Sequence, residues 1–166
     1  MADAVDKVLE LWRAERPDLD PWPTAVIGRV GRLARLLDRW QKEFLAPFGM
    51  ENWELDVLTT LRRSGPPYEL TPGALLRAAM VTSGAITNRI DRMEAKGLVE
   101  RVPGSGDRRS VRIRLTRRGH QVLDEVFPHA IEQGERLLAV LDDDERENLV
   151  NALRSLLESM GDTSLD

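Results

Sequence analysis

The chain of 166 residues contains no cysteine and only two histidines, His120 and His129. Without thiols there can be no disulfide, cysteine nucleophile or thiol-based redox sensor, and their absence favours a reducing cytoplasm. The two histidines lie nine positions apart and do not share a helical face, which argues against a metal site. We expect no metal and no other cofactor.

Long apolar runs are also missing. No stretch approaches the length of a membrane span, and the N-terminus has acidic Asp3 and Asp6 and no apolar core of signal length. We therefore expect a cytoplasmic protein with no membrane partner. No G-x-S-x-G motif, phosphate-binding loop or pair of histidines is present, so the sequence does not predict an enzyme.

Charge is distributed unevenly along this acidic chain, whose net charge is −4. Residues 82–118 contain ten Lys and Arg against four Asp and Glu, while 119–166 contain three against twelve. A basic block within an acidic protein is typical of a nucleic-acid-binding surface, although it can also be a solvated face.

Apolar periodicity organises the chain into helices and one hairpin. A helical period runs through 5–14, 24–48, 50–63, 71–80, 83–97, 116–141 and 142–160. A two-residue period in 98–102 and 110–115 predicts an antiparallel hairpin. Helix boundaries are indicated by Thr71 with Pro72, by Gly97, by Thr116 and by the acidic run at 142–144. The expected fold class is mainly α, with a small β-hairpin wing.

A helix, a short turn, a second helix and a charged hairpin form the order of a winged helix-turn-helix. On the second helix Ile86, Ile90 and Met93 form one apolar stripe. The opposite side contains small and polar residues, among them Asn88 and Arg92. Asparagine can pair with adenine and arginine with guanine or a phosphate, so this side is expected to face the major groove.

The remaining DNA contacts are expected at the helix start and in the hairpin. Thr82 and Ser83 can place hydroxyls and backbone amides against a phosphate. Arg108 and Arg109 at the hairpin tip suit a narrow minor groove, and Asp107 is expected to hold a neighbouring arginine. Arg112 and Arg114 favour a solvated strand face. The complete expected DNA-binding set is Thr71, Thr82, Ser83, Gly84, Thr87, Asn88, Arg92, Asp107, Arg108 and Arg109.

Residues 70–123, LTPGALLRAAMVTSGAITNRIDRMEAKGLVERVPGSGDRRSVRIRLTRRGHQVL, resemble the MarR family of transcriptional regulators. They share the motifs R-x-E-x-x-G-L-V-x-R, D-R-R and L-T-x-x-G. The resemblance implies a homodimer that binds a palindromic double-stranded DNA operator, most often as a repressor. It divides the chain into N-terminal helices at 1–48, a winged DNA-binding domain at 49–118 and C-terminal dimerisation helices at 119–166. An ordinary intrachain bundle is the alternative for the terminal helices.

A narrower resemblance concerns a small aromatic or anionic effector. The added N-terminal helix looks like the branch of the family that responds to urate and related anions, which implies a ligand site at Trp12, Asp56 and Arg89. The sequence departs from that branch at Ser64, where urate-binding members have asparagine. Two alternatives stay open: an effector-independent regulator in which Asp56 and Arg89 form a structural pair, and a protein-interaction module.

Overall fold

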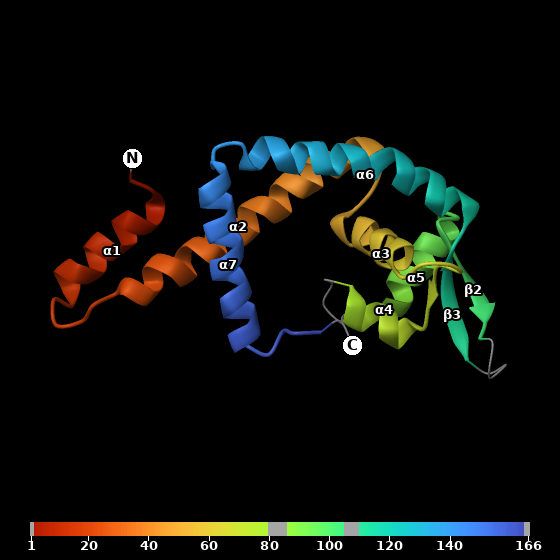
Figure 1. Cartoon of the computed structure of the whole chain (residues 1–166), viewed down its shortest axis with the longest axis horizontal. Coiled ribbons are helices and arrows are strands. Elements are labelled where there is room, and N and C mark those ends of the chain that lie inside the picture. Colours follow the sequence, from red (N-terminus) through yellow and green to blue (C-terminus); the bar gives the residue numbers. More distant parts are fainter. Residues whose placement is uncertain (1, 80–85, 105–109, 165–166) are drawn as a thin grey trace. The chain divides into compact units, whose positions relative to one another are not determined.

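The computed structural model describes residues 2–79, 86–104 and 110–164. Within these ranges the elements are α1 (Ala4–Glu15), α2 (Trp22–Leu45), the 3-10 helix η1 (Ala46–Phe48), α3 (Asn52–Arg63), β1 (Glu69–Leu70), α4 (Pro72–Ala78), α5 (Ile86–Ala95), β2 (Val99–Pro103), β3 (Val111–Leu115), α6 (Arg117–Leu138) and α7 (Asp143–Ser159) (Figure 1). The mainly helical class with a β wing is confirmed. The chain divides into two units, Met1–Asn52 and Trp53–Asp166.

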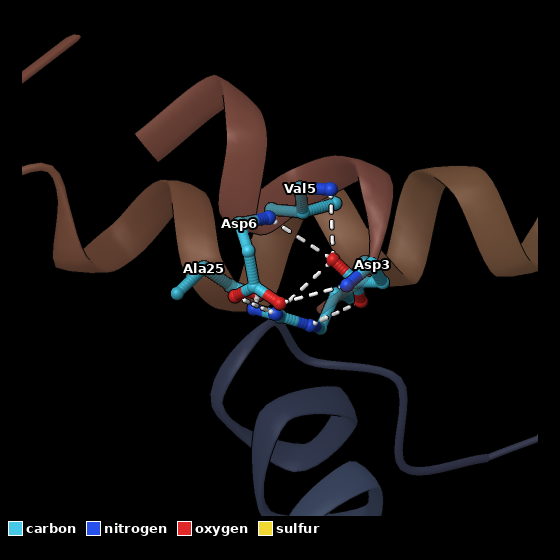
Figure 2. Close-up of polar contacts among 5 residues, drawn as sticks. Asp3, Val5, Asp6 and Ala25 are labelled. Atoms are coloured by element: carbon cyan, nitrogen blue, oxygen red, sulfur yellow. Dashed lines mark hydrogen bonds and ion pairs between the residues drawn. The ribbon is translucent and has the colours of Figure 1, made fainter. Parts of the chain in front are cut away.

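In the first unit, α1 packs along α2. Val5 and Leu9 are buried, and the Val5 side chain packs against α2 at Gly28. Polar contacts fasten the start of α1: Asp3 caps the helix through the backbone N–H groups of Val5 and Asp6, and both aspartates accept hydrogen bonds from Arg29 of α2 (Figure 2). This unit therefore joins its helices by a narrow apolar contact and an exposed ionic cluster.

In the second unit, a three-stranded antiparallel sheet in the order β1-β3-β2 packs with α4, α5 and α6. The hairpin predicted from the two-residue period pairs Arg101 with Ile113 and Val99 with Leu115. The strand β1 is not predicted by the sequence pattern, because its two residues are too few to show a period. The fully buried side chains of this unit include Leu58, Leu61, Leu75, Ile90, Met93 and Ile113.

Three predicted helix caps are present and set the path of the chain into each helix. The Thr71 hydroxyl accepts from the N–H of Ala74 at 3.2 Å, and the Thr116 hydroxyl accepts from that of Gly119 at 3.0 Å. Asp142 caps α7 in the same way. Side-chain oxygens at these positions satisfy N–H groups that have no partner within the helix.

Glycine is required at two junctions that position the wing. Gly97, the second residue after α5, has a φ of +68°, a left-handed conformation that favours glycine. At Gly119 a Cβ atom would lie 2.1 Å from the carbonyl oxygen of Leu98, so only glycine lets the first turn of α6 reach the start of the wing. Because of these two glycines, the hairpin and α6 lie close to α5, the predicted recognition helix whose polar side is expected to face the major groove.

Apolar side chains on the long helices are largely exposed. No residue of α7 is buried, and the exposed large apolar residues of α2 and α7 include Val26, Ile27, Val30, Leu33, Leu36, Leu149, Val150, Leu153, Leu156 and Leu157. They recur at three- and four-residue spacing, so each helix presents an apolar stripe. Among the described residues, no helix is both long and apolar enough to cross a bilayer.

Candidate DNA-binding surface

Helix α5 has a buried face and an exposed face, as its periodicity predicts. Ile90 and Met93 are buried in the core of the second unit. Thr87, Asn88 and Arg92 are exposed. The side chains that can bond base edges or phosphates are therefore on the outer side, while the apolar side fixes the helix on the domain.

Trp53 of α3 holds two arginines of α5. The guanidinium carbon of Arg89 lies 5.4 Å from the centre of the Trp53 ring, and that of Arg92 lies 5.1 Å from it. These distances are within the range of cation–π attraction. This contact of Trp53 is not among the predictions from the sequence. The available signal was the three-residue spacing of the two arginines, which places both on one side of the helix.

A buried carboxylate anchors the end of the recognition helix. The Glu54 side chain is 0% exposed, and its two oxygens lie 2.7 and 2.8 Å from Nζ of Lys96, which is 39% exposed. Lys96 directly follows the last residue of α5. Removing one partner of an ion pair whose other partner is buried is costly, because a buried charge is left without compensation. Trp53 and Glu54, adjacent on α3, thus contact α5 at Arg89 and Arg92 and the residue that directly follows it.

A third connection joins α5 to the wing. Arg101 of β2 bonds Asp91 and Glu94 of α5, and its backbone N–H donates to Glu94 at 3.1 Å. The hydrogen bond with Asp91 raises the pKa of the Arg101 guanidinium, and the charge of Glu94 adds to this effect. Pairing with Arg101 offsets part of the negative charge of the two carboxylates beside Asn88 and Arg92, where a polyanion is expected.

The two arginines of β3 pair with acids of the sheet. Arg114 lies 2.8 Å from Glu100, and Arg112 lies 3.7 Å from Glu69 of β1. This agrees with their interpretation as strand residues of a solvated face. The cross-strand pairing also gives β1 a role, since it supplies the acid that Arg112 contacts.

Several predicted DNA-contacting residues lie outside the described residues, namely Thr82, Ser83, Gly84, Asp107, Arg108 and Arg109. Of the others, Thr71 is half-buried at the start of α4, and its hydroxyl is engaged by the helix cap. The role of each residue in DNA binding stays a prediction.

The predicted effector residues belong to different units. Trp12 is largely exposed in the first unit, where it lines a pocket of about 360 Å³ together with Arg16 and Leu19. Asp56 and Arg89 are half-buried in the second unit. Asp56 lies one turn after Trp53 on α3, and Arg89 contacts that tryptophan. The pairing of Asp56 with Arg89 stays a prediction.

Comparison with known proteins shows the same architecture in transcriptional regulators. The MarR family profile matches residues 48–110. The chain is 37% identical over 145 residues to the transcriptional regulator PecS of Dickeya dadantii, covering 87% of each protein. It is 30% identical over 146 residues to the transcriptional repressor NicR of Pseudomonas putida, covering 85% of this chain and 90% of NicR. A crystal structure of a MarR mutant from E. coli with operator DNA is similar with a TM-score of 0.70 and 25% identity, covering 94% of this chain and 99% of that one.

Proposed function

Since this chain belongs to the MarR family of DNA-binding transcriptional regulators and is not an enzyme, we propose that it is a dimeric repressor of a palindromic operator, released by a small anionic or aromatic ligand. The exposed polar face of α5 carries the proposal, because it presents Asn88 and Arg92 outward on a helix whose other face is buried. The MarR–operator complex and the repressor NicR support it by similarity.

In this proposal Asn88 and Arg92 contact base edges, and the remaining members of the predicted set contact the backbone or shape the interface. Thr71, Thr82, Ser83 and Thr87 supply hydroxyls or backbone amides to phosphates, and Gly84 allows close approach. In the wing, Arg108 and Arg109 enter the minor groove while Asp107 orients an arginine. The winged domain at 49–118 is the DNA-binding part.

The terminal helices, at 1–48 and 119–166, form the proposed dimer interface. Apolar stripes on α2 and α7 support this assignment, because exposed apolar patches of this extent favour association. A two-fold dimer places two recognition helices about one helical turn of DNA apart, at roughly 34 Å, which matches a palindrome. Sedimentation at micromolar concentration tests the interface: a single species of 18.8 kDa contradicts it.

The proposed effector site consists of Trp12, Asp56 and Arg89. An anion that bonds Arg89 changes the contacts of a residue next to Asn88 on the recognition helix. For release to follow, the anion must bind the DNA-incompetent geometry more tightly than the competent one. A coupling of about 1 to 3 kcal/mol lowers DNA affinity by about fivefold to a hundredfold.

An effector-independent regulator is the second candidate, and one observation favours it. Arg89 already has a structural partner in the Trp53 ring. In this alternative Arg89 and Asp56 only position α5, and Trp12 only packs.

Selection of bound duplexes from a random pool tests the main proposal. We expect a palindromic consensus, and we expect Asn88→Ala or Arg92→Ala to cost about 1 to 3 kcal/mol of binding and to relax the preference at one position per half-site. Replacing Arg108 and Arg109 together by alanine is expected to weaken binding and to flatten the dependence of log affinity on log salt by about one to two units. Unchanged affinity in that double variant contradicts the wing assignment.

A screen of urate, salicylate and other aromatic anions against the selected complex tests the effector. The best responder is then repeated with Trp12→Phe, which leaves all proposed DNA contacts in place. An unchanged response in Trp12→Phe removes Trp12 from the sensing site, and the absence of any responder favours the effector-independent alternative.

A further inference from the structure

Helix α2 contains a second concentration of positive charge, outside the winged domain. It has five Lys and Arg against two Asp and Glu, in a chain whose net charge is −4. Three of its arginines are exposed and, at about 100° per residue, lie within about 60° of one another around the helix axis. We call Arg32, Arg35 and Arg39 the arginine row. None of them belongs to the predicted DNA-binding set, so the row requires a separate explanation.

The charge of the arginine row is poorly neutralised within the chain. Among the residues that the structure describes, Arg32 and Arg35 make no ion pair and no hydrogen bond. Arg39 has only a loose contact with Glu43 at 3.7 Å, and both side chains are more than 70% exposed. The other two basic residues of α2 are held by aspartates at closer range. Like charges three or four residues apart destabilise a helix, so helix stability does not explain the row, whereas an anionic partner does.

The arginine row lies on the side of α2 away from its apolar stripe. The exposed apolar residues of this helix, which include Val30 and Leu33, are centred about 150° from the row around the helix axis. A second copy of the chain that covers the apolar stripe in the proposed dimer therefore leaves the arginines in solvent. This placement favours an anionic partner other than the second copy.

We propose that the arginine row binds the phosphate backbone of double-stranded DNA, as a sequence-independent contact in addition to those of the winged domain. The chain belongs to a family of DNA-binding regulators, so a polyanion of complementary charge is its expected partner. At a rise of about 1.5 Å per residue the row extends over about 10 Å, and a DNA strand presents a phosphate about every 3.4 Å along the duplex axis. The row can therefore contact about two or three phosphates, whose oxygens suit the guanidinium group. This inference rests on the proposed function, because it adds a contact to the same complex.

The test measures the affinity of the full chain for the selected operator and for a scrambled duplex of the same length, at several salt concentrations. We expect Arg32→Gln combined with Arg35→Gln to lower the affinity for both duplexes by about tenfold or more at physiological salt. The dependence of log affinity on log salt should flatten by about two units. The ratio of the two affinities should not change, since backbone contacts carry no sequence information. An unchanged salt dependence with both duplexes overturns the proposal.

The matched control is Arg136→Gln combined with Arg146→Gln. These arginines of α6 and α7 are exposed and pair with acids of their own helices, so the control changes the net charge by the same amount away from α2. It should keep the wild-type salt dependence, and an equal flattening in the control would show an effect of net charge alone and overturn the proposal. Arg32→Lys combined with Arg35→Lys keeps the charge and should also keep the salt dependence. Arginine, lysine and glutamine have similar helix propensities, so the melting temperature should stay the same in all these variants of α2.

Two further measurements separate the arginine row from dimerisation and from the proposed function. If the double glutamine variant of α2 dissociates more readily in sedimentation but keeps the wild-type salt dependence of DNA binding, the row contacts a second copy and the proposal is wrong. Asn88→Ala should instead lower the affinity for the operator more than that for the scrambled duplex. Equal affinity of the wild type for the two duplexes contradicts the proposed function, whereas the salt dependence measured with the scrambled duplex still tests the row.

Discussion

The winged domain and the long helices contain similar apolar side chains but use them differently. Leu58 of α3 is 0% exposed, whereas Leu153 of α7 is 39% exposed. Both are leucines on an amphipathic helix. Burial removes apolar surface from water and contributes about 25 cal/mol per Å². The winged domain buries its apolar side chains within one chain. The apolar stripe of α7 would be fully buried only against another protein surface.

The largest expected difference between the two regions is the cost of truncating a leucine. We expect Leu58→Ala to lower the free energy of unfolding by about 2 to 5 kcal/mol, because it leaves a cavity in a packed core. Leu153→Ala should cost much less at dilute concentration and, in the proposed dimer, should mainly raise the dissociation constant between the two protomers. Urea unfolding at several protein concentrations measures both effects. Equal, concentration-independent losses contradict the comparison.

The ion pair that anchors α5 is expected to have the next largest effect. Lys96→Met leaves the buried Glu54 carboxylate without the ammonium group, which we expect to cost about 1 to 3 kcal/mol of unfolding free energy. The matched control is Lys7→Met, whose pair with Glu10 lies on the surface of α1 with both side chains more than half exposed. Surface pairs of this kind contribute about 0 to 1 kcal/mol. Similar losses in the two variants would show that the buried pair has no special role.

The contact of Trp53 with the two arginines should affect DNA binding. Trp53→Leu removes a cation–π contact of about 0.5 to 1 kcal/mol for each guanidinium and frees Arg92 to adopt other rotamers. We therefore expect operator affinity to fall by about twofold to tenfold. Trp22→Leu, an exposed tryptophan of the first unit, serves as the control in the same fluorescence anisotropy titration. Equal affinities of wild type and Trp53→Leu contradict a positioning role for Trp53.

The smallest expected effect concerns the polar contacts of Asp3 and Asp6 that hold the start of α1. A backbone hydrogen bond from Asp6 holds the pKa of Asp3 below its ordinary value of 3.8, and a backbone hydrogen bond from Asp3 does the same for Asp6, with Arg29 adding to both. Groups with a lowered pKa in the folded state stabilise it above their unfolded pKa and lose this contribution as the pH falls through the folded value. Protection of the α1 amides from exchange, corrected for intrinsic rate, should decrease below about pH 4.

Arg29→Gln is the corresponding variant. It should remove part of the protection of α1 at pH 7 and make the remaining protection less sensitive to acid, since the arginine no longer lowers either pKa. Unchanged protection in Arg29→Gln, with the wild-type dependence on pH, would show that the backbone caps alone hold the start of α1.

Local sequence signals predicted much of the fold. Thr71, Thr116 and Gly97 were assigned to helix ends because hydroxyl caps and left-handed glycines act within a few residues of the chain. The exposed side of α5 was assigned from a period of 3.6 residues, and the structure places Asn88 and Arg92 there. The strand β1 cannot be predicted from its own two residues, because they form a strand only by pairing with β3.

The order of helices, the hairpin and the basic winged region follow from periodicity, capping and charge over short distances, so they can be predicted from the sequence. Which distant residues support the recognition helix depends on tertiary packing. Trp53 and Glu54 reach Arg89, Arg92 and Lys96 across at least 36 positions of the chain. Such contacts depend on the packing of α3 beside α5, and no local pattern specifies which aromatic ring or carboxylate a given arginine or lysine will meet.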